Sequence, residues 1–253
     1  MAAFSGQLYA GTFNPHTGLQ VWKASLDRFP YRWKPVLTAG ASRGNTNESV
    51  ASMCVFRGAL YIGTGIQGLS YDPTYDAGPG GAELIRIFPD DSWEMVVGEV
   101  RRSFTGTTYP LSDLAPSFDN KFSCVIWRLA EHDGWLYAGT YDWSSLLGFL
   151  RPFPPAYMRG VISRFVEQEA GFDLWLSRDG ATWEPVTLNG FGNPFNNGLR
   201  SLFSTQKGLF VGTQAMPLRS GRNPLARNAA ARGDCEVWWG SASFGPRMPA
   251  RRS

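Results

Sequence analysis

Apolar stretches alternate with glycine turns along this chain, and one five-residue pattern occurs four times. Each copy has leucine, an aromatic residue, a variable residue, glycine and threonine. The copies span residues 8–12, 60–64, 136–140 and 209–213. Such self-similarity marks a repeat architecture, in which each unit buries its faces against its neighbours.

The segments around each copy also repeat. A glycine turn lies just upstream, and an apolar segment precedes that turn in three copies, at 50–56, 122–129 and 199–203. Downstream come an alternating or aromatic-rich segment and then a tryptophan-centred one, at 33–37, 93–97 and 183–187. Four antiparallel strands per unit, A to D, describe a propeller blade. We therefore predict an all-β fold, with residues 1–253 forming a single β-propeller domain.

The two terminal units are incomplete in the sequence. The first shows no strand A before residue 8, and the last shows no tryptophan-type strand D after residues 235–239. Two architectures remain open: a four-bladed ring with irregular ends, or part of a longer propeller. The second is favoured, because a closed ring usually joins its two termini within one blade.

One turn between strands C and D resembles a known motif. Ser177, Asp179, Gly180 and Trp183 follow the spacing of the Asp-box, or BNR, turn of sialidase-like propellers, shortened by one residue. The aspartate can bond the turn amides while the tryptophan packs between sheets. The resemblance implies a propeller fold and no activity, because this turn is structural in that family and lies away from the ligand face.

The connections between strands B and C are long, at 65–81, 141–171 and 214–234, and all leave the same face of the blades. Long loops in compact domains are usually functional or disordered. The D–A loops on that face are rich in asparagine, which suits either turn chemistry or a ring of amides that binds sugar hydroxyls. The candidate ligand residues are Asn45, Asn47, Asn120, Asn193 and Asn196, with Tyr141, Asp142 and Trp143 from a neighbouring loop.

The insertion at 141–171 has a character of its own. Apolar pairs at four-residue intervals predict an amphipathic helix near 155–169. The segment before it is apolar for a loop, so it is either a cap over the propeller face or a docking surface for a protein partner. The candidate interface residues are Leu146, Leu147, Phe149, Leu150 and Phe153.

Charge and composition narrow the partners. The net charge is only +3, and no basic run interleaves with aromatics, so no nucleic-acid partner is expected. The basic tail at 246–253 is expected to be a solvated terminus. No apolar run reaches the ~20 residues of a transmembrane segment. No signal peptide is visible, so a cytoplasmic location is the default expectation.

Metal and cofactor chemistry has little support in the sequence. Three cysteines and two histidines show no metal-ligand spacing, and neither a disulfide framework nor a cofactor is expected. Asp72, Asp76, Asp119 and Asp142 are oxygen ligands suited to Ca²⁺, but their spacing matches no known calcium loop.

No catalytic residue can be assigned from motifs. Sialidase-like enzymes use an arginine cluster, and the strand register predicts that Arg128 and Arg200 lie on opposite faces and do not converge. No nucleophile elbow or phosphate-binding loop is present. The sequence therefore favours a non-catalytic binding or scaffold subunit that docks to a protein partner or larger complex through its long loops. The alternative is binding of a glycan or small polar ligand, or glycoside hydrolysis, at the asparagine-lined mouth.

Overall fold

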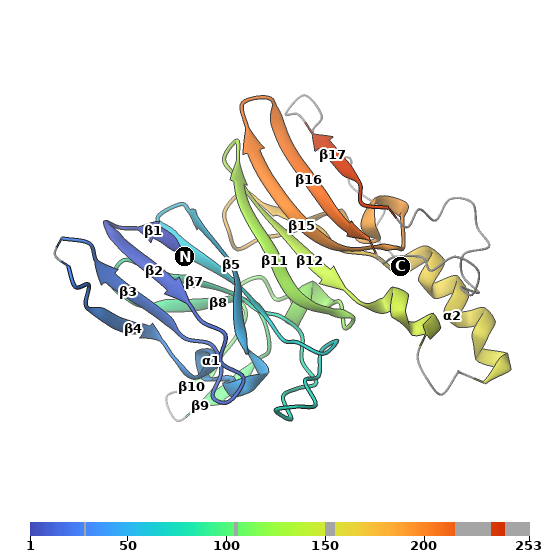
Figure 1. Cartoon of the computed structure of the whole chain (residues 1–253), viewed down its shortest axis with the longest axis horizontal. Coiled ribbons are helices and arrows are strands. Elements are labelled where there is room, and N and C mark those ends of the chain that lie inside the picture. Colours follow the sequence, from blue (N-terminus) through green and yellow to red (C-terminus); the bar gives the residue numbers. More distant parts are fainter. Residues whose placement is uncertain (28, 104–105, 150–154, 216–233, 241–253) are drawn as a thin grey trace.

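The computed structural model describes residues 1–27, 29–103, 106–149, 155–215 and 234–240. These residues form successive antiparallel blades that stand side by side in an arc (Figure 1). The fold is all-β and of the propeller type, as the repeat predicted.

Blades 1 to 3 each contain four strands in the order A, B, C, D. Blade 1 has β1 (Ala2–Phe4), β2 (Gln7–Gly11), β3 (Val21–Ser25) and β4 (Trp33–Leu37). Blade 2 has β5 (Ser49–Phe56), β6 (Ala59–Gly65), β7 (Leu84–Ile87) and β8 (Trp93–Val97). Blade 3 has β11 (Ser123–His132), β12 (Trp135–Asp142), β13 (Leu174–Ser177) and β14 (Glu184–Thr187). Blade 4 has β15 (Asn196–Thr205), β16 (Gly208–Ala215) and β17 (Val237–Gly240).

The connections carry short helices and one hairpin. The helices are α1 (Ala39–Ser42), η1 (Gly44–Thr46), η2 (Pro116–Asp119), η3 (Ser144–Phe149), α2 (Ala156–Glu169) and η4 (Gly190–Gly192). The hairpin of β9 (Arg101–Ser103) and β10 (Gly106–Thr108) follows blade 2. Helix α2 confirms the helix predicted near 155–169.

One prediction about the ends was wrong. The first blade does have a strand A, because β1 pairs with β2 from Ala2 opposite Tyr9 to Phe4 opposite Gln7. Three residues are too few to show a hydrophobic period, so the strand was invisible in the sequence. The expected place of the last strand D, and the tail at 246–253, lie outside the described residues.

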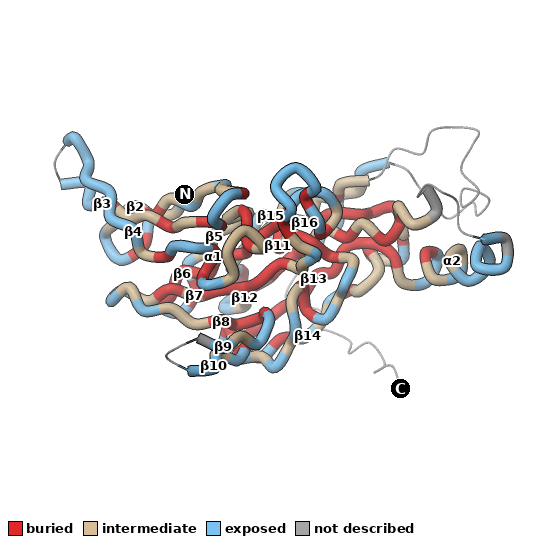
Figure 2. Tube along the Cα trace, turned by 90° about the horizontal axis from the view of Figure 1, so that it is seen from below, coloured by how far each residue is buried: buried red, intermediate tan, exposed pale blue. Residues whose placement is uncertain are grey.

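The apolar core lies between blades, and the Leu–aromatic pair of each repeat explains why. Leu60 packs in the cluster shared with blade 1, whereas Tyr61 packs in the cluster shared with blade 3. Leu136 and Tyr137 likewise face blades 2 and 4. Adjacent strand residues point to opposite faces, so in blades 2 and 3 this pair joins the blade to both neighbours. Figure 2 shows buried residues concentrated in the strands and exposed ones at the turns.

The inner strand of the next blade packs closely against the strand that carries the repeated glycine. The residue two positions after it pairs with the inner strand of that blade, at Phe13–Ser49, Gly65–Val125 and Tyr141–Gly198. A Cβ on Gly63 would lie 2.5 Å from the carbonyl oxygen of Ile126 in blade 3. At Gly212 the nearest atom would be Ser201 Cβ of the same blade, at 3.2 Å.

The turn between β13 and β14 is closed by Asp179. Its Oδ1 accepts hydrogen bonds from the amides of Ala181 at 2.8 Å and Thr182 at 2.7 Å. Trp183 after the turn is buried and lies edge-on to Phe118, with ring centroids 5.3 Å apart. Burial opposes ionisation of Asp179, but the turn amides outweigh it and lower the pKa of Asp179 to about 2.

We predict that Gly63→Ala destabilises the protein and Gly212→Ala does so much less. The new methyl group at position 63 meets backbone of the neighbouring blade, which cannot move independently, and we expect a loss of about 1–3 kcal/mol. Chemical denaturation measures both variants. Equal losses would contradict the role given to this glycine in blade contact.

We predict that Asp179→Ala lowers the free energy of unfolding by about 1 kcal/mol at neutral pH. Because folding lowers the pKa of Asp179 from 3.8 to about 2, its stabilisation is present above about pH 4 and disappears as the pH falls toward 2. Asp27→Ala is the control, since within the described part of the chain the hydrogen bonds of Asp27 are to Ser25 alone. Urea unfolding from pH 2 to pH 7 tests both, and a pH-independent difference at position 179 would refute the assignment.

Candidate functional site

The threonine of each repeat positions one polar residue at the start of strand C. Its hydroxyl oxygen accepts a hydrogen bond from that residue's backbone N–H. The pairs are Thr12 with Gln20 at 2.9 Å, Thr64 with Glu83 at 2.7 Å, Thr140 with Asp173 at 2.9 Å and Thr213 with Glu236 at 2.8 Å. Each blade therefore presents a carboxylate or amide at an equivalent place.

Asparagines of the D–A loops hold these carboxylates. Nδ2 of Asn47 donates to Glu83 at 2.7 Å. In blade 4, Asn193 and Asn196 both donate to Glu236 at 2.8 Å. The asparagines predicted to form a ring of amides therefore form separate pairings, one set in each of blades 2 to 4.

A repeated left-handed turn places these donors. Gly40 and Ala41, Ser117 and Phe118, and Gly190 and Phe191 all have φ between 57° and 60°. The residue two positions after each pair bonds back to the first member through its own N–H. Those residues are Arg43, Asn120 and Asn193, which occupy equivalent positions.

Blade 3 departs from the repeat at one bond. Trp22 Nε1 donates to Gln20 at 3.0 Å, and Trp238 Nε1 donates to Glu236 at 2.9 Å. The equivalent residue of blade 3, Trp175, is only 8% exposed, and its Nε1 has no hydrogen-bond partner among the residues that the structure describes. Asp173, two residues before it, is one methylene shorter than the glutamate or glutamine of the other blades. The shorter side chain leaves an unmatched donor at this point.

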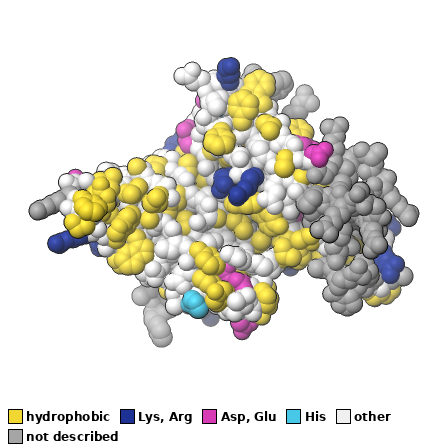
Figure 3. All heavy atoms as spheres, viewed as in Figure 1, with side chains coloured by type: hydrophobic (Ala, Val, Ile, Leu, Met, Phe, Trp, Pro, Cys, Tyr) yellow, Lys and Arg dark blue, Asp and Glu magenta, His cyan; other side chains and the backbone are white. Residues whose placement is uncertain are grey.

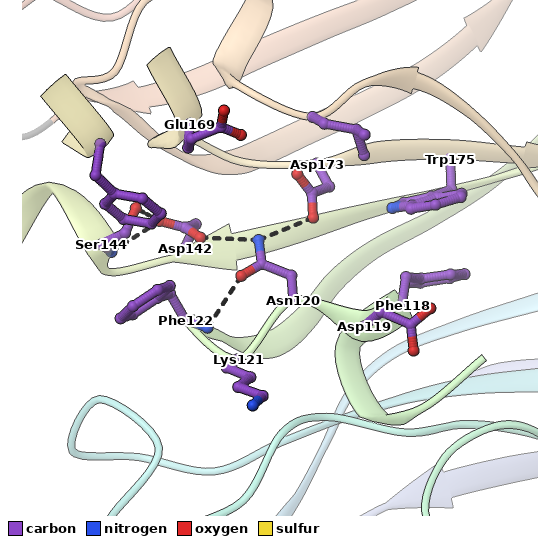
Figure 4. A pocket seen from close by; sticks show the side chains of 12 residues that line it. Phe118, Asp119, Asn120, Lys121, Phe122, Asp142, Ser144, Glu169, Asp173 and Trp175 are labelled. Atoms are coloured by element: carbon purple, nitrogen blue, oxygen red, sulfur yellow. Dashed lines mark hydrogen bonds between the residues drawn. The ribbon is translucent and has the colours of Figure 1, made fainter. Parts of the chain in front are cut away.

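A cavity of about 460 Å³ lies beside this unmatched donor. Its walls include Trp175 stacked on Phe118, with centroids 5.0 Å apart and planes 11° apart. Phe122 and Phe165 form another part of the wall, with ring centroids 5.3 Å apart. Figure 4 shows the indole nitrogen of Trp175 directed toward the side chains of Asp173 and Asn120.

Asn120 links two buried carboxylates in this cavity. Its Nδ2 donates to Asp142 Oδ2 at 2.9 Å and to Asp173 Oδ2 at 3.0 Å (Figure 4). The amide is fixed in this orientation because its Oδ1 accepts the Phe122 N–H at 3.0 Å. The two hydrogens of an amide nitrogen diverge, so the two carboxylate oxygens are about 5 Å apart.

The fold does not require an acidic residue at position 142. The register places it where blade 2 has Ile66 and blade 4 has Ala215. Its side chain is 1% exposed, and it accepts hydrogen bonds from the backbone N–H and the hydroxyl of Ser144. Burial raises the pKa of Asp142, while the bonds from Ser144 and Asn120 oppose the shift. Perturbed acids in a cavity are typical of functional sites.

The other predicted ligand residues lie elsewhere. Asn45 donates to the backbone oxygen of Tyr75 at 3.3 Å. Tyr141 is edge-on to Trp127 at 5.3 Å, and Trp143 Nε1 donates to Ser70 Oγ at 3.1 Å. Asn120 and Asp142 are thus the predicted residues that the structure brings together in the cavity.

The interface residues are partly described. Leu147 packs against the cluster of Val166 in α2, and Leu146 is half-buried. The side chain of Phe149, and the whole of Leu150 and Phe153, lie outside the described residues. A protein-docking role for this segment stays a prediction.

Sequence reasoning missed Asp173 and Trp175. A usable signal was present, because strand C begins with Gln20-Val-Trp22, Glu83-Leu-Ile85, Asp173-Leu-Trp175 and Glu236-Val-Trp238. The lone aspartate in this series marks the blade with the cavity.

The prediction that Arg128 and Arg200 stay apart was wrong. Nε of Arg128 donates to the backbone oxygen of Arg200 at 2.8 Å. Register irregularities next to Arg128 in β11 and at Arg200 in β15 break the strict alternation that the prediction assumed. Burial and the neighbouring Arg200 lower the pKa of Arg128. Figure 3 shows basic side chains at the centre of the face viewed there.

Two further features concern ions and membranes. Within the described part of the chain, no three His, Cys, Asp or Glu side chains gather as a metal site would need, so the four aspartates suggested for Ca²⁺ do not cluster. No described helix is both long and apolar enough to cross a membrane.

Comparisons with known proteins give structural neighbours only. No family model matches the sequence, and no curated protein matches it. A GH32 beta-fructofuranosidase from Bombyx mori is similar in structure, with a TM-score of 0.39, 12% identity, and coverage of 85% of this chain and 41% of that one. A candidate glycosidase from Bacteroides thetaiotaomicron has a TM-score of 0.39, 13% identity, and coverage of 87% and 62%. The chain spans less than two thirds of either neighbour.

These neighbours correct one expectation. Both are described as glycosidases, which goes against the non-catalytic scaffold favoured by the sequence and favours its alternative, glycoside hydrolysis. At this level of similarity the likeness carries no argument about what this chain does.

We predict that Asp173→Glu stabilises the protein by about 1 kcal/mol. The longer side chain can accept from Trp175 as Glu236 does from Trp238, which satisfies a buried donor. Glu236→Asp is the reverse change in blade 4 and should be destabilising. Thermal and chemical unfolding measure both, and a destabilised Asp173→Glu variant would contradict the comparison between blades.

Proposed function

We propose that the cavity of blade 3 binds a carbohydrate. The observation that carries this proposal is the unpartnered Nε1–H of Trp175, which is buried and directed toward the carboxylate of Asp173. A hydroxyl group satisfies this donor, because its oxygen accepts a hydrogen bond. A ligand rich in hydroxyls fits this arrangement better than an apolar one.

The walls and the size of the cavity also suit a carbohydrate ligand. Trp175, Phe118, Phe122 and Phe165 offer apolar surface for the C–H face of a sugar ring. The volume of about 460 Å³ is within the usual range for small-molecule sites. The polar groups are already fixed by Asn120 and Ser144, so little side-chain entropy is lost on binding.

Glycoside hydrolysis is a second candidate, favoured by the paired carboxylates. Glycosidases use one protonated and one ionised carboxyl group, and a separation of about 5 Å belongs to the retaining geometry. Burial raises the pKa of Asp142, which suits it to the acid, and Asp173 would be the second carboxylate. Release of nitrophenol from a panel of nitrophenyl glycosides tests this, with Asp142→Asn and Asp173→Asn as inactive variants. Binding of sugar without release by the native protein would leave binding as the whole function.

We predict that Trp175→Phe weakens sugar binding about 3- to 10-fold without unfolding the protein, because it removes one hydrogen bond and keeps most of the wall. Trp22→Phe is the matched control, since the indole N–H of Trp22 is satisfied by Gln20 in blade 1. Saturation-transfer NMR with a panel of mono- and disaccharides gives the readout. Equal effects of the two variants, or no saturation transfer to any sugar, would overturn the proposal.

A further inference from the structure

A β-bulge recurs at the same point of the inner strand in blades 2, 3 and 4. In each strand one residue is left out of the pairing with strand B, immediately before the residue opposite the repeated glycine. The residues left out are Ala51, Trp127 and Arg200. Bulges redirect side chains and are common beside active sites. The repeated bulge therefore presents a different side chain from each of these blades at the inner strands.

Blades 3 and 4 bring two arginines together at this point. Arg128, next to the bulge in β11, donates from Nε to the backbone oxygen of Arg200 at 2.8 Å. Its Nη1 donates to the backbone oxygen of Trp127, also at 2.8 Å. The guanidinium group of Arg200 lies over the Trp127 ring, 4.6 Å from the ring centroid. Both guanidinium groups are therefore held before any ligand arrives, which limits the side-chain entropy lost on binding.

The positive charge of these two side chains is not balanced by the chain. Among the residues that the structure describes, neither Arg128 nor Arg200 is paired with an acid. The remaining parts of the sequence contain no aspartate or glutamate. Burial and the charge of Arg200 both lower the pKa of Arg128, so its charged form is destabilised here. A bound anion relieves the repulsion between the two like charges.

Both arginines keep hydrogen-bond donors for such an anion. Within the described part of the chain, Nη2 of Arg128 and the guanidinium group of Arg200 make no hydrogen bond. Arg200 is exposed, so a ligand can reach it from solvent. Figure 3 shows basic side chains at the centre of the viewed face, with mainly uncharged atoms around them. The N–H groups of a guanidinium match the oxygens of phosphate and carboxylate groups.

A small cavity adjoins Arg128. Its volume is about 290 Å³, and its walls include Arg128, Leu129 and residues 50–53 of β5. The hydroxyl of Ser52 donates to the backbone oxygen of Ile126 at 2.8 Å, which leaves its own oxygen to accept a hydrogen bond from a ligand. The volume is close to the lower limit of about 300 Å³ for small-molecule sites, so a ligand of few atoms fits. Among the described residues, none lines both this cavity and the cavity of blade 3.

We propose that Arg128 and Arg200 bind the phosphate group of a small phosphate monoester, whose remaining atoms occupy the adjoining cavity. This second site goes beyond carbohydrate binding in blade 3 and does not depend on it. Charge selects phosphate over carboxylate, because a phosphate monoester is close to a dianion at neutral pH and balances both guanidinium groups. A carboxylate balances only one. The three terminal oxygens of the phosphate also accept from donors on two different strands.

Calorimetric titration of the full chain with methyl phosphate, at about 0.15 M salt, tests the site. Acetate and a short single-stranded oligonucleotide are the comparison probes. We expect methyl phosphate to bind about tenfold or more tightly than acetate, and the oligonucleotide, with one charge per phosphate, to show no binding. The affinity for methyl phosphate should fall several-fold from pH 7 to pH 5, because the ester takes up its second proton at about pH 6.

The opposite results each overturn the proposal. Acetate that binds as well as methyl phosphate would remove the requirement for a dianion. An oligonucleotide that binds as well would make the basic surface a nucleic-acid interface. No binding of methyl phosphate at pH 7 would show that the two arginines are solvated without a phosphate ligand.

Arg200→Gln is the variant that tests the location, and we expect it to weaken methyl phosphate binding about tenfold or more. Arg57→Gln is the matched control and should leave binding unchanged. Arg57 is also exposed and lies over an aromatic ring, with Cζ 5.6 Å from the centroid of Phe56. Arg200→Lys covers the case in which Arg200→Gln does not fold, and it should also weaken binding because an ammonium group lacks the paired donors. Equal effects at positions 200 and 57, or native affinity in a folded variant at position 200, would contradict the proposal.

Discussion

The close passage of one blade's inner strand over the glycine of the preceding blade is the contact on which this structure depends. It fixes the spacing between blades. The leucine and the aromatic residue that precede the glycine in the repeat can then pack in the apolar clusters on the two sides of the blade. The next residue, threonine, then turns its hydroxyl to the start of strand C. One short motif thus sets both blade packing and the place of a polar side chain.

Because the four blades are built from one repeat, residues at equivalent positions can be compared between them. Asp173 has the position of Glu83 and Glu236 and is held by its backbone in the same way, so its presence alone says nothing about function. What distinguishes blade 3 is the shorter side chain, the unmatched indole N–H and the extra carboxylate of Asp142. Blade 2 satisfies its equivalent carboxylate, Glu83, with Arg101 and Arg43 of the chain.

The repeat made the four strands of the middle blades predictable from the sequence, and apolar pairs at four-residue intervals predicted helix α2. Strand β1 was not predictable, because three residues carry no period. Arg128 and Arg200 were misplaced because irregular register breaks strand alternation. Asn120 and Asp142 were selected for their residue types, but their meeting depends on a left-handed turn at Ser117 and Phe118, where glycine is expected and absent. The consequence of aspartate at position 173 appears only when the other blades show which bond it fails to make.

The indole N–H resonance of Trp175 in a ¹H–¹⁵N NMR spectrum tests the central claim most directly. Trp22 and Trp238 provide internal references, because their indole N–H groups already have acceptors in Gln20 and Glu236. On titration with a sugar that binds, the account predicts that the Trp175 signal moves to a hydrogen-bonded position while the signals of Trp22 and Trp238 stay in place. If the sugar binds and the Trp175 signal does not move, the ligand site is not the cavity of blade 3.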